Sequence, residues 1–442
     1  MVFSSPEFLF LFMPIVCILY YIVRKPILQN GLLILASLFF YAWGEPRYIL
    51  LMVASILVNY LFVRMLTRTP AKTVVTAAAI FNVGMLFVFK YAGLPVRLPI
   101  GISFYTFQAL SLVIDLYRDR KAGEDVRVTL PDVLLYISFF PQLIAGPIVQ
   151  YKDIRPYLRL RTVDIEGISR GIRRFVVGLS KKVLLADTVA VVCDALYAQG
   201  DGRISGIAVW VAAICYMFQI YFDFSGYSDM AIGLGEMFGF HFKENFNMPY
   251  TASSVRDFWR RWHISLSTWF RDYVYIPLGG NRKGRVRTVI NRMTVFALTG
   301  IWHGAGFNFL LWGLWHGFFV SVEQFAPVGK SVLRSIAGRI YTFLVVLVGF
   351  VLFRAESLGK AGTMLALMFT DWSCSRASVG IALRYLTPYV LIILLICLVA
   401  SLWKPKFALP VWVSNVLTLF LLLLCMMTVA SAAYSPFIYF RF

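Results

Sequence analysis

Long apolar runs, separated by short polar turns, cover this chain from Phe8 to Tyr434. A helix needs roughly 20 residues to cross the hydrocarbon core of a membrane, and most of the runs approach that length. We therefore predict one polytopic, all-α integral-membrane domain over residues 1–442, with no soluble domain between the runs. The predicted spans are 8–23, 28–43, 48–66, 74–91, 99–117, 204–222, 340–353, 381–403 and 411–434.

Two further apolar stretches contain helix-breaking residues, which simple spans lack. Residues 132–150 include Pro141, Gly146 and Pro147, and residues 296–320 include five glycines. Irregular backbone at membrane depth persists only where protein or a water-filled cavity satisfies its polar groups. We predict that both stretches form re-entrant segments that line a cavity.

Basic residues set the predicted orientation. Lysines and arginines follow the first, third and fifth predicted spans, whereas the alternate loops carry few. Because cytoplasmic loops are enriched in Lys and Arg, these loops are predicted to be cytoplasmic and the N-terminus to lie outside. Residues 152–182 are also rich in basic residues and are predicted to form amphipathic helices at the cytoplasmic face.

The composition indicates that the basic residues of the chain meet membrane lipids and not nucleic acid. Hydrophobic residues make up 60% of the chain and charged residues 14%, whereas soluble domains have roughly 45–50% and about 25%. In such a chain a net charge of +20 is explained by basic loops that meet anionic membrane lipids, and we do not expect nucleic-acid binding. The six cysteines form no CxxC pair and no metal spacing.

All four histidines fall between His241 and His316. A histidine is expensive in lipid and suited to moving protons near neutral pH, so this region is the first candidate for chemistry. His303 lies in an apolar, glycine-rich segment, where it either packs or reacts. His316 follows thirteen residues later, a turn of roughly 220° on a continuous helix, so the two are not expected to share a face. No two histidines have the i, i+4 spacing of a helical zinc site, so we expect no metal.

Residues 241–295 form the longest polar stretch. Ser254 and Asp257 have the spacing of a capping box, and the apolar stripe after them predicts a helix over 255–273 at an interface or along a cavity. His263 borders that stripe, either as an amphipathic residue at the membrane interface or as part of a site. The stripe contains Trp259, Trp262, Leu266, Phe270 and Tyr273.

Two other polar groups of residues allow two interpretations each. Asp223 and Tyr227 belong to a polar insertion at the end of a predicted span, which indicates a buried polar network or a cavity wall. The basic loop 281–285 includes Arg282 and Lys283. It is either a solvated cytoplasmic turn or a site for an anionic group, such as the phosphates of a nucleotide-bearing donor.

The runs Phe258–Ser267 (FWRRWHISLS) and Gly300–Gly304 (GIWHG) resemble the signature of the membrane-bound O-acyltransferase (MBOAT) family. The branch that the chain resembles is that of the bacterial polysaccharide O-acetyltransferases, typified by the membrane subunit of alginate acetylation. The resemblance runs from the N-terminus to about Gly317 and is weaker beyond it. Further matching segments are Met1–Ser5, Pro99–Tyr105, Leu143–Pro147, Tyr221–Gly233 and Leu278–Arg282.

The resemblance implies an architecture and a reaction. The expected fold is a bundle of roughly 9–12 transmembrane helices with re-entrant and amphipathic helices around a central funnel. A catalytic core, 131–325, is expected between N-terminal spans, 1–130, and C-terminal spans, 326–442. The family transfers an acyl group from a thioester to a hydroxyl. In this branch we expect cytoplasmic acetyl-CoA as donor substrate and no tightly bound cofactor.

The resemblance also implies a location and partners. The chain is expected in the bacterial cytoplasmic (inner) membrane. Its acetyl group is expected to reach an exported cell-surface polysaccharide, such as an alginate-like exopolysaccharide, with the help of a periplasmic or extracellular acetyltransferase partner.

The expected site residues follow from the family motif. The near-invariant family histidine matches His303, the second conserved polar position matches His263, and His316 is expected to be packing. A base is needed to take the proton of the attacking hydroxyl, and N–H donors are needed for the oxyanion. The expected oxyanion, donor-binding or cavity-lining residues are Trp302, Asn308, Trp262, Arg282, Lys283, Asp223 and Tyr227.

Three other functions remain open at the sequence level. Within the same fold, the chain could transfer D-alanine to teichoic acid from a carrier-protein thioester. From another class, it could transport a polysaccharide or lipid-linked saccharide, although we find no inverted repeat of the kind that transporters carry. A structural scaffold of a secretion complex is the third.

Overall fold

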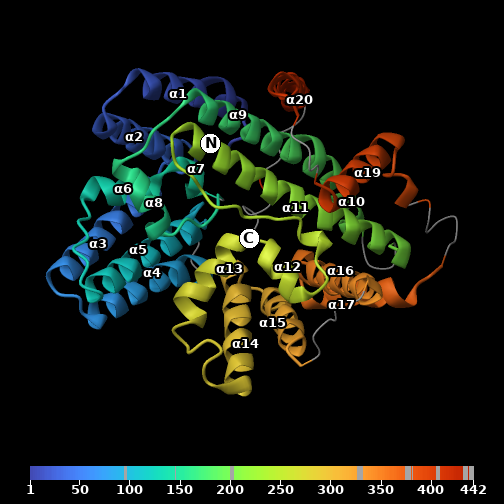
Figure 1. The fold of residues 1–442 in the computed structure, drawn as a ribbon. Helices are drawn as coiled ribbons and strands as arrows, with labels where there is room; N and C mark the ends of the chain where they lie inside the picture. The colour runs from blue at the N-terminus through green and yellow to red at the C-terminus, as the bar shows by residue number, and fades with distance from the viewer. Residues whose placement is uncertain are drawn as a thin grey trace. The chain divides into compact units, whose positions relative to one another are not determined.

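The structure is a computed structural model, which describes residues 1–93, 97–144, 146–199, 204–325, 332–373, 380, 382–404, 409–431 and 437. Within these ranges the regular secondary structure is helical and no β-strand is present. The predicted all-α class is therefore confirmed, and Figure 1 shows the helices in chain order.

The described helices include six that are long and apolar enough to cross a membrane, in agreement with a multi-pass membrane protein. Three shorter apolar helices cover 8–22, 307–322 and 388–402. The predicted span 99–117 is a helix, α5 (Ile102–Lys121), but it is mostly buried and is not among the six. The six are Pro26–Gly44, Ile49–Arg68, Lys72–Tyr91, Gly206–Met237, Ser335–Arg354 and Val411–Ser431.

The chain divides into two compact units that interleave along the sequence. The first comprises Met1–Leu179, Tyr227–Glu244 and Asn415–Tyr434. The second comprises Ser180–Gly226, Asn245–Ser414 and Ser435–Phe442. Two helices, α11 (Gly206–Met237) and α20 (Val411–Ser431), are each divided between the two units.

The remaining elements of the first unit are η1 (Phe8–Phe12), α1 (Met13–Ile22), α2 (Pro26–Gly44), α3 (Ile49–Arg68), α4 (Lys72–Tyr91), α5, α6 (Leu130–Ser138), α7 (Phe140–Leu143), α8 (Tyr151–Arg159) and α9 (Ile165–Ser180). Those of the second are η2 (Lys181–Ala186), α10 (Asp187–Tyr197), η3 (Pro249–Thr251), α12 (Val255–Arg261), α13 (Ile264–Phe270), η4 (Arg271–Tyr275), α14 (Gly284–His303), α15 (Phe307–Val322), α16 (Val332–Arg354), α17 (Leu358–Thr370) and α19 (Pro388–Leu402).

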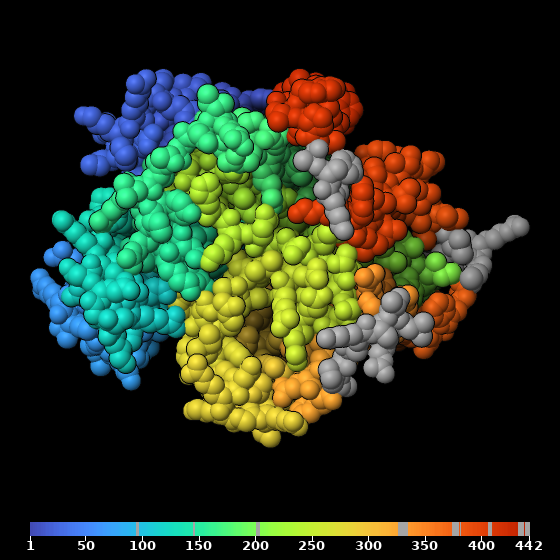
Figure 2. Space-filling view, viewed as in Figure 1, coloured from blue at the N-terminus to red at the C-terminus, as the bar shows by residue number. Residues whose placement is uncertain are grey.

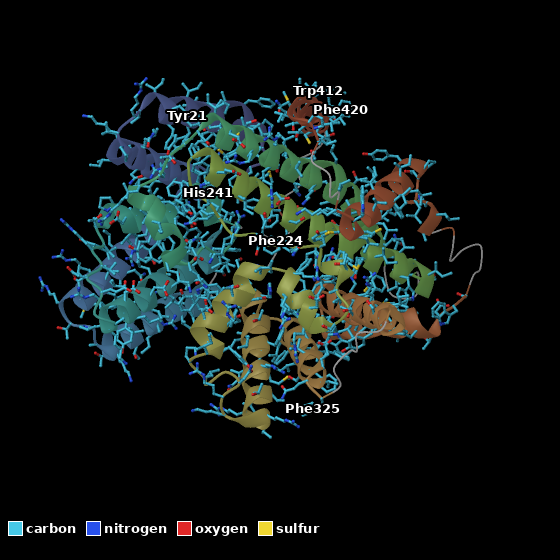
Figure 3. The ribbon with its side chains drawn as sticks, in the orientation of Figure 1. Tyr21, Phe224, His241, Phe325, Trp412 and Phe420 are labelled. Atoms are coloured by element: carbon cyan, nitrogen blue, oxygen red, sulfur yellow. The ribbon has the colours of Figure 1, made fainter. Side chains whose placement is uncertain are left out.

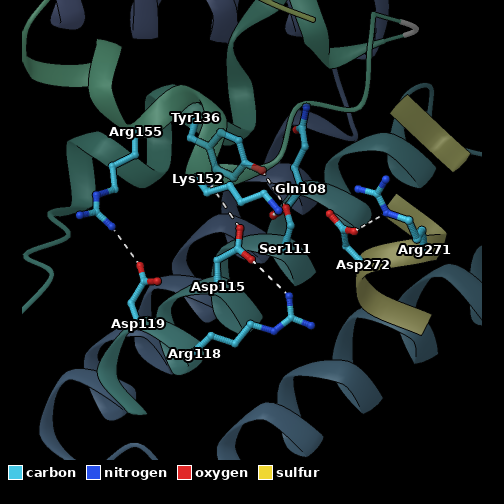
Figure 4. A network of polar contacts seen from close by, with 10 residues as sticks. All are labelled: Gln108, Ser111, Asp115, Arg118, Asp119, Tyr136, Lys152, Arg155, Arg271 and Asp272. Atoms are coloured by element: carbon cyan, nitrogen blue, oxygen red, sulfur yellow. Dashed lines mark hydrogen bonds and ion pairs between the residues drawn. The ribbon is translucent and has the colours of Figure 1, made fainter. Parts of the chain in front are cut away.

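In the first unit, polar side chains of α5 anchor the segments around it. Asp115 is buried, ion-pairs with Arg118 at 3.8 Å and accepts the backbone N–H of Lys152 at 3.4 Å (Figure 4). Ser111 and Tyr136 share a hydrogen bond of 2.9 Å between their hydroxyls. These contacts hold the start of α8 and the short helix α6 against α5, because a buried polar group without a partner is costly.

The predicted interruption of 132–150 is confirmed. Helix α6 ends at Ser138, α7 begins at Phe140, and residues 147–150 are not helical. A Cβ atom at Gly146 would lie 2.8 Å from the carbonyl oxygen of Pro141, so the chain folds back on itself there only with glycine. The predicted helices of 152–182 are present as α8 and α9, which are amphipathic.

The polar insertion at 221–229 does not end a helix. Helix α11 continues through it to Met237, so the predicted span 204–222 is too short. Asp223, Ser225, Ser228 and Asp229 are all buried within the helix. Partners that are distant in sequence make this possible, and the local pattern of polar residues does not reveal them.

Candidate active site

The FWRRWHISLS segment contains a break that the predicted continuous helix 255–273 lacks. Helix α12 ends at Arg261 and α13 begins at Ile264, and His263 between them has φ 43° and ψ 55°, in the left-handed region. That conformation is uncommon for any residue other than glycine. The prediction of one helix is therefore wrong, since a fixed backbone turn at His263 interrupts the stripe.

The N-terminus of α12 is capped from two directions. Ser254 Oγ accepts the backbone N–H of Asp257 at 3.0 Å, which is half of the predicted capping box. The second acceptor is the carboxylate of Glu323, at the end of α15, which accepts the N–H groups of Val255 at 2.5 Å and Arg256 at 2.9 Å. Glu323 thus ties α12 to α15.

Hydrogen bonds to a neighbouring loop hold the turn at His263. The backbone carbonyl of Asn245 accepts the N–H of Ile264 at 2.9 Å, and Asn245 Oδ1 accepts the N–H of Ser265 at 3.1 Å. The same Oδ1 lies 3.2 Å from His263 Nδ1. The rings of Phe224 and His263 are nearly perpendicular, with 4.6 Å between their centroids, and Phe224 is labelled in Figure 3.

The environment of His263 favours a neutral imidazole. The side chain is buried, with 1% exposed, and burial lowers the pKa of His263 to about 3. Desolvation disfavours the imidazolium, so the ring is uncharged near neutral pH and able to accept a proton.

His303 occupies the last position of α14 and is buried among aromatic rings. Its ring centroid lies 4.6 Å from Trp302, 5.0 Å from Trp312 and 5.0 Å from Phe353. The extended backbone of Gly304 ends the helix, and a Cβ there would lie 2.3 Å from the ring of Phe309. The helix therefore stops at His303, and α15 returns alongside it (Figure 1).

The hairpin changes the relation between His303 and His316. His303 and His316 do not lie on one continuous helix, because residues 304–306 separate α14 from α15. His316 is buried and its ring lies 5.3 Å from that of Trp312, which also contacts His303. Both histidines pack against the same indole, so the expectation that they share no face, which assumed one continuous helix, is wrong.

Glycines of 296–320 allow α14 and α15 to approach each other closely. A Cβ at Gly313 would lie 2.2 Å from the carbonyl oxygen of Phe296, and one at Gly300 would lie 2.4 Å from that of Phe309. Such distances are far below van der Waals contact, so both positions require glycine. Glycines in such a segment allow close approach of either another helix or a substrate, and at these two positions the structure shows another helix.

One aromatic cluster connects His263 to His303 within the second unit. Successive ring centroids along it are 4.6–5.8 Å apart, within the range of favourable aromatic pairs. From His263 to His303 the cluster passes through Phe224, Phe246, Trp262, Phe258, Trp259 and Trp312. Trp262, predicted to line the cavity, is a central member of the cluster.

A pocket of about 310 Å³ opens beside this cluster, between α12, α13, η4, α14 and α15. A hollow lies among the yellow atoms of this part of the chain in Figure 2. Its lining combines aromatic residues, including Trp259 and Phe296, with Ser267 and Thr299. Four arginines also line it: Arg256, Arg260, Arg271 and Arg292.

The other predicted site residues have varied surroundings. Asn308 donates its amide hydrogens to the backbone carbonyls of Leu352 at 3.4 Å and Ala355 at 3.0 Å, so these donors hold the end of α16. Asp223 forms a buried ion pair of 2.9 Å with Lys182. Tyr227 belongs to the first unit, where it stacks on Phe3 at 4.6 Å.

The remaining residues lie on the surface. Arg282 and Lys283 are exposed in the loop before α14, next to Asn281, which does line the pocket. His241, labelled in Figure 3, is exposed in the first unit and meets the ring of Tyr157 at 5.4 Å.

The pocket arginines, Asn245 and Trp312 are not among the site residues predicted from the sequence. The sequence does contain a signal for Arg292. Arg292, Val295, Thr299 and His303 recur with spacings of three and four, which places them along one face of a helix. Nothing local marks Asn245, because its role depends on a contact with a residue eighteen positions away.

Comparison with known proteins identifies the family. The MBOAT (membrane-bound O-acyltransferase) family model matches residues 42–328, which include His263 and His303. This chain belongs to the MBOAT family. It is an O-acyltransferase and a multi-pass membrane protein.

The names of this MBOAT protein's relatives refer to several different polymers. It is 44% identical to a probable alginate O-acetylase of Pseudomonas fluorescens over 85% of this chain and 77% of the relative. It is 34% identical to a peptidoglycan O-acetyltransferase of Helicobacter pylori over 82% of this chain and 78% of the relative. A teichoic acid D-alanyltransferase of Bacillus subtilis is 30% identical over 48% of this chain and 55% of that protein.

Proposed function

We propose that this protein takes acetyl groups from cytoplasmic acetyl-CoA and moves them across the membrane for O-acetylation of an exported cell-surface polysaccharide. The observation that carries the proposal is the extent of similarity to O-acetylating relatives, which cover 82–85% of the chain. The D-alanyltransferase relative covers only 48%. That coverage favours acetyl over D-alanyl transfer.

The reaction needs one proton acceptor at the acyl centre. The acceptor hydroxyl oxygen forms a bond to the thioester carbonyl carbon and the carbon–sulfur bond breaks. The hydroxyl proton passes to an imidazole and then to the leaving thiolate, so that the products are an O-acetyl ester and a free thiol. We assign His303 as that base, because imidazole transfers protons near neutral pH.

His263 has a supporting role in this proposal. It is neutral and buried, and Asn245 orients its ring. The aromatic cluster between the two histidines keeps water away from the acyl centre, which strengthens polar interactions there. The rings of Trp302 and Trp312 both pack against His303, and we propose their indole N–H groups as the oxyanion donors.

Location and partner follow from the same proposal. Under this proposal the basic loops and the donor lie on the cytoplasmic side of the membrane, and the N-terminus lies outside. The protein would lie in the bacterial cytoplasmic membrane. A periplasmic or extracellular acetyltransferase would then complete the transfer to the polymer.

The experiment is release of free thiol from acetyl-CoA by the purified protein in detergent, with and without a polysaccharide acceptor. The wild type and the surface variant His241→Ala should release thiol at similar rates. His303→Ala should lose the activity and keep its size-exclusion profile. Thiol release by His303→Ala at the wild-type rate would contradict the assignment of the base.

A second arm separates the alternatives. A D-alanyl carrier-protein thioester replaces acetyl-CoA in the same assay. Release from the carrier alone would identify D-alanyl transfer. Vesicle transport of a saccharide without release of thiol from either donor would identify the transporter.

A further inference from the structure

We propose that the arginine pocket (the cavity lined by Arg256, Arg260, Arg271 and Arg292) binds the phosphate groups of the thioester donor, whose acyl end extends along α14 to His303. The inference rests on the proposed function, because it takes the donor to be a thioester that carries its phosphates at the far end of a flexible arm. It assigns the phosphates to the pocket instead of the neighbouring loop residues Arg282 and Lys283.

The charge of the pocket is the first argument. Arginine presents a planar set of N–H donors that matches the oxygens of a phosphate, and four line one cavity of about 310 Å³. Arg271 ion-pairs with Asp272 at 2.8 Å (Figure 4), and Arg292 donates to Gln324 at 2.7 Å. Two of the four are therefore held in place by a neighbouring side chain.

Arg256 supplies the second argument. Its Nη2 atom is buried and makes no hydrogen bond within the described part of the chain. Burial lowers the pKa of Arg256, and the positive charges of Arg292 and Arg260 lower it further, against an opposite effect of Glu323. A bound anion would relieve both the lost hydrogen bond and the repulsion.

Other arginines in the protein have a different environment. Arg174 contacts Asp229 and Glu244, both at 2.6 Å, and Arg354 contacts Asp194 at 2.8 Å. These are arginines whose charge is balanced by carboxylates. At the pocket Asp272 balances Arg271, but the carboxylate of Glu323 is engaged in capping α12.

The path to His303 is the third argument. Arg292, Val295 and Thr299 line the pocket from α14, and His303 lies one turn beyond Thr299 on the same face. The rise of an α-helix places His303 about 16 Å from Arg292 along the axis. A donor with its thioester at the end of a long arm fits this separation, whereas a compact acyl phosphate does not.

The test compares two donors that differ in their phosphates. Acetyl-CoA and S-acetylpantetheine carry the same thioester, but the second has no phosphate. Arg256→Gln with Arg260→Gln should raise the KM for acetyl-CoA about tenfold or more, with kcat nearly unchanged. The KM for S-acetylpantetheine should stay at the wild-type value. The control variant, Arg282→Gln with Lys283→Gln, removes as many charges outside the pocket and should leave both KM values unchanged.

A second variant guards against misfolding. Ser267→Trp fills the pocket without a change of charge and should raise the KM for acetyl-CoA. In the wild type, 3′,5′-ADP should inhibit thiol release competitively, and the pocket variants should lose this inhibition. An unchanged KM in the arginine variants, or an equal rise for both donors, would overturn the inference.

The outcomes distinguish this inference from the proposed function. If the wild type turns over acetyl-CoA but the pocket variants behave like the loop control, only the pocket assignment fails. If the wild type does not turn over acetyl-CoA but binds 4′-phosphopantetheine through the pocket arginines, acetyl-CoA is the wrong donor and the pocket assignment stands.

Discussion

Asn245 Oδ1 accepts the backbone N–H of Ser265 at 3.1 Å and lies 3.2 Å from Nδ1 of His263. A backbone N–H can only donate, so the atom that it meets is the amide oxygen and not the amide nitrogen. An amide oxygen can only accept a hydrogen bond, so Nδ1 of His263 must donate and therefore carries the hydrogen. Nε2 is then the basic nitrogen. A single asparagine thus sets the tautomer of the imidazole.

Asn245→Asp should change the pH profile of the enzyme. A carboxylate beside Nδ1 stabilises the imidazolium and raises the pKa of His263 from about 3. The neutral form would then be lost as the pH falls through the raised value, so activity should decline at a higher pH than in the wild type. The measurement is kcat/KM for thiol release between pH 5 and pH 9, and identical profiles would contradict a role for neutral His263 in the reaction.

His263→Asn should be more stable than His263→Ala. Both variants lack the imidazole, but asparagine tolerates the left-handed backbone at this position better than alanine does. We expect a difference of about 1 kcal/mol in the free energy of unfolding, measured by thermal unfolding in detergent. Equal stability of the two variants would show that the turn relaxes when the ring is removed.

Stability should fall as the pH drops below about 6.5, the ordinary pKa of histidine. The unfolded chain binds a proton at His263 in that range, whereas the folded chain binds it only near pH 3. Between these values the unfolded state holds more protons, so the free energy of unfolding decreases as the pH falls. His263→Asn should lose less stability between pH 7 and pH 5 than the wild type, by the same unfolding measurement.

Lys182→Met should destabilise the second unit. Lys182 is buried and lies 2.6 Å from Asp187 and 2.9 Å from Asp223. Removing the cation leaves buried carboxylate charge, which costs about 3–5 kcal/mol. The double variant Lys182→Met with Asp223→Asn should recover part of the loss. If the double variant is no more stable than the single one, the pair is not coupled.

Gly313→Ala should disrupt the hairpin that carries His303. The new Cβ would lie 2.2 Å from the carbonyl oxygen of Phe296, and separating the helices costs roughly 1–3 kcal/mol. Thiol release should fall with the loss of contact between His303 and Trp312. Gly362→Ala is the control, because a Cβ there meets nothing within 4 Å. It should unfold at or slightly above the wild-type temperature.

The sequence predicted the broken segments correctly because proline and glycine act locally. Pro141 and Gly146 mark the interruption between α6 and α8, and Gly304 marks the end of α14. The break at His263 escaped prediction because no proline or glycine occupies it. The turn is held by Asn245, and hydrogen bonds from another loop are not encoded in the local pattern.

By itself, the sequence determined the all-α membrane class, the family and the two histidines of its motif, because these depend on apolar run length and on local residue order. Only the tertiary structure decided that His303 and His316 share Trp312, that Asn245 fixes the His263 ring and that four arginines meet in one pocket. The physical reason is that each of these relations joins side chains from separate helices or loops. Such contacts form only when burial packs those elements together.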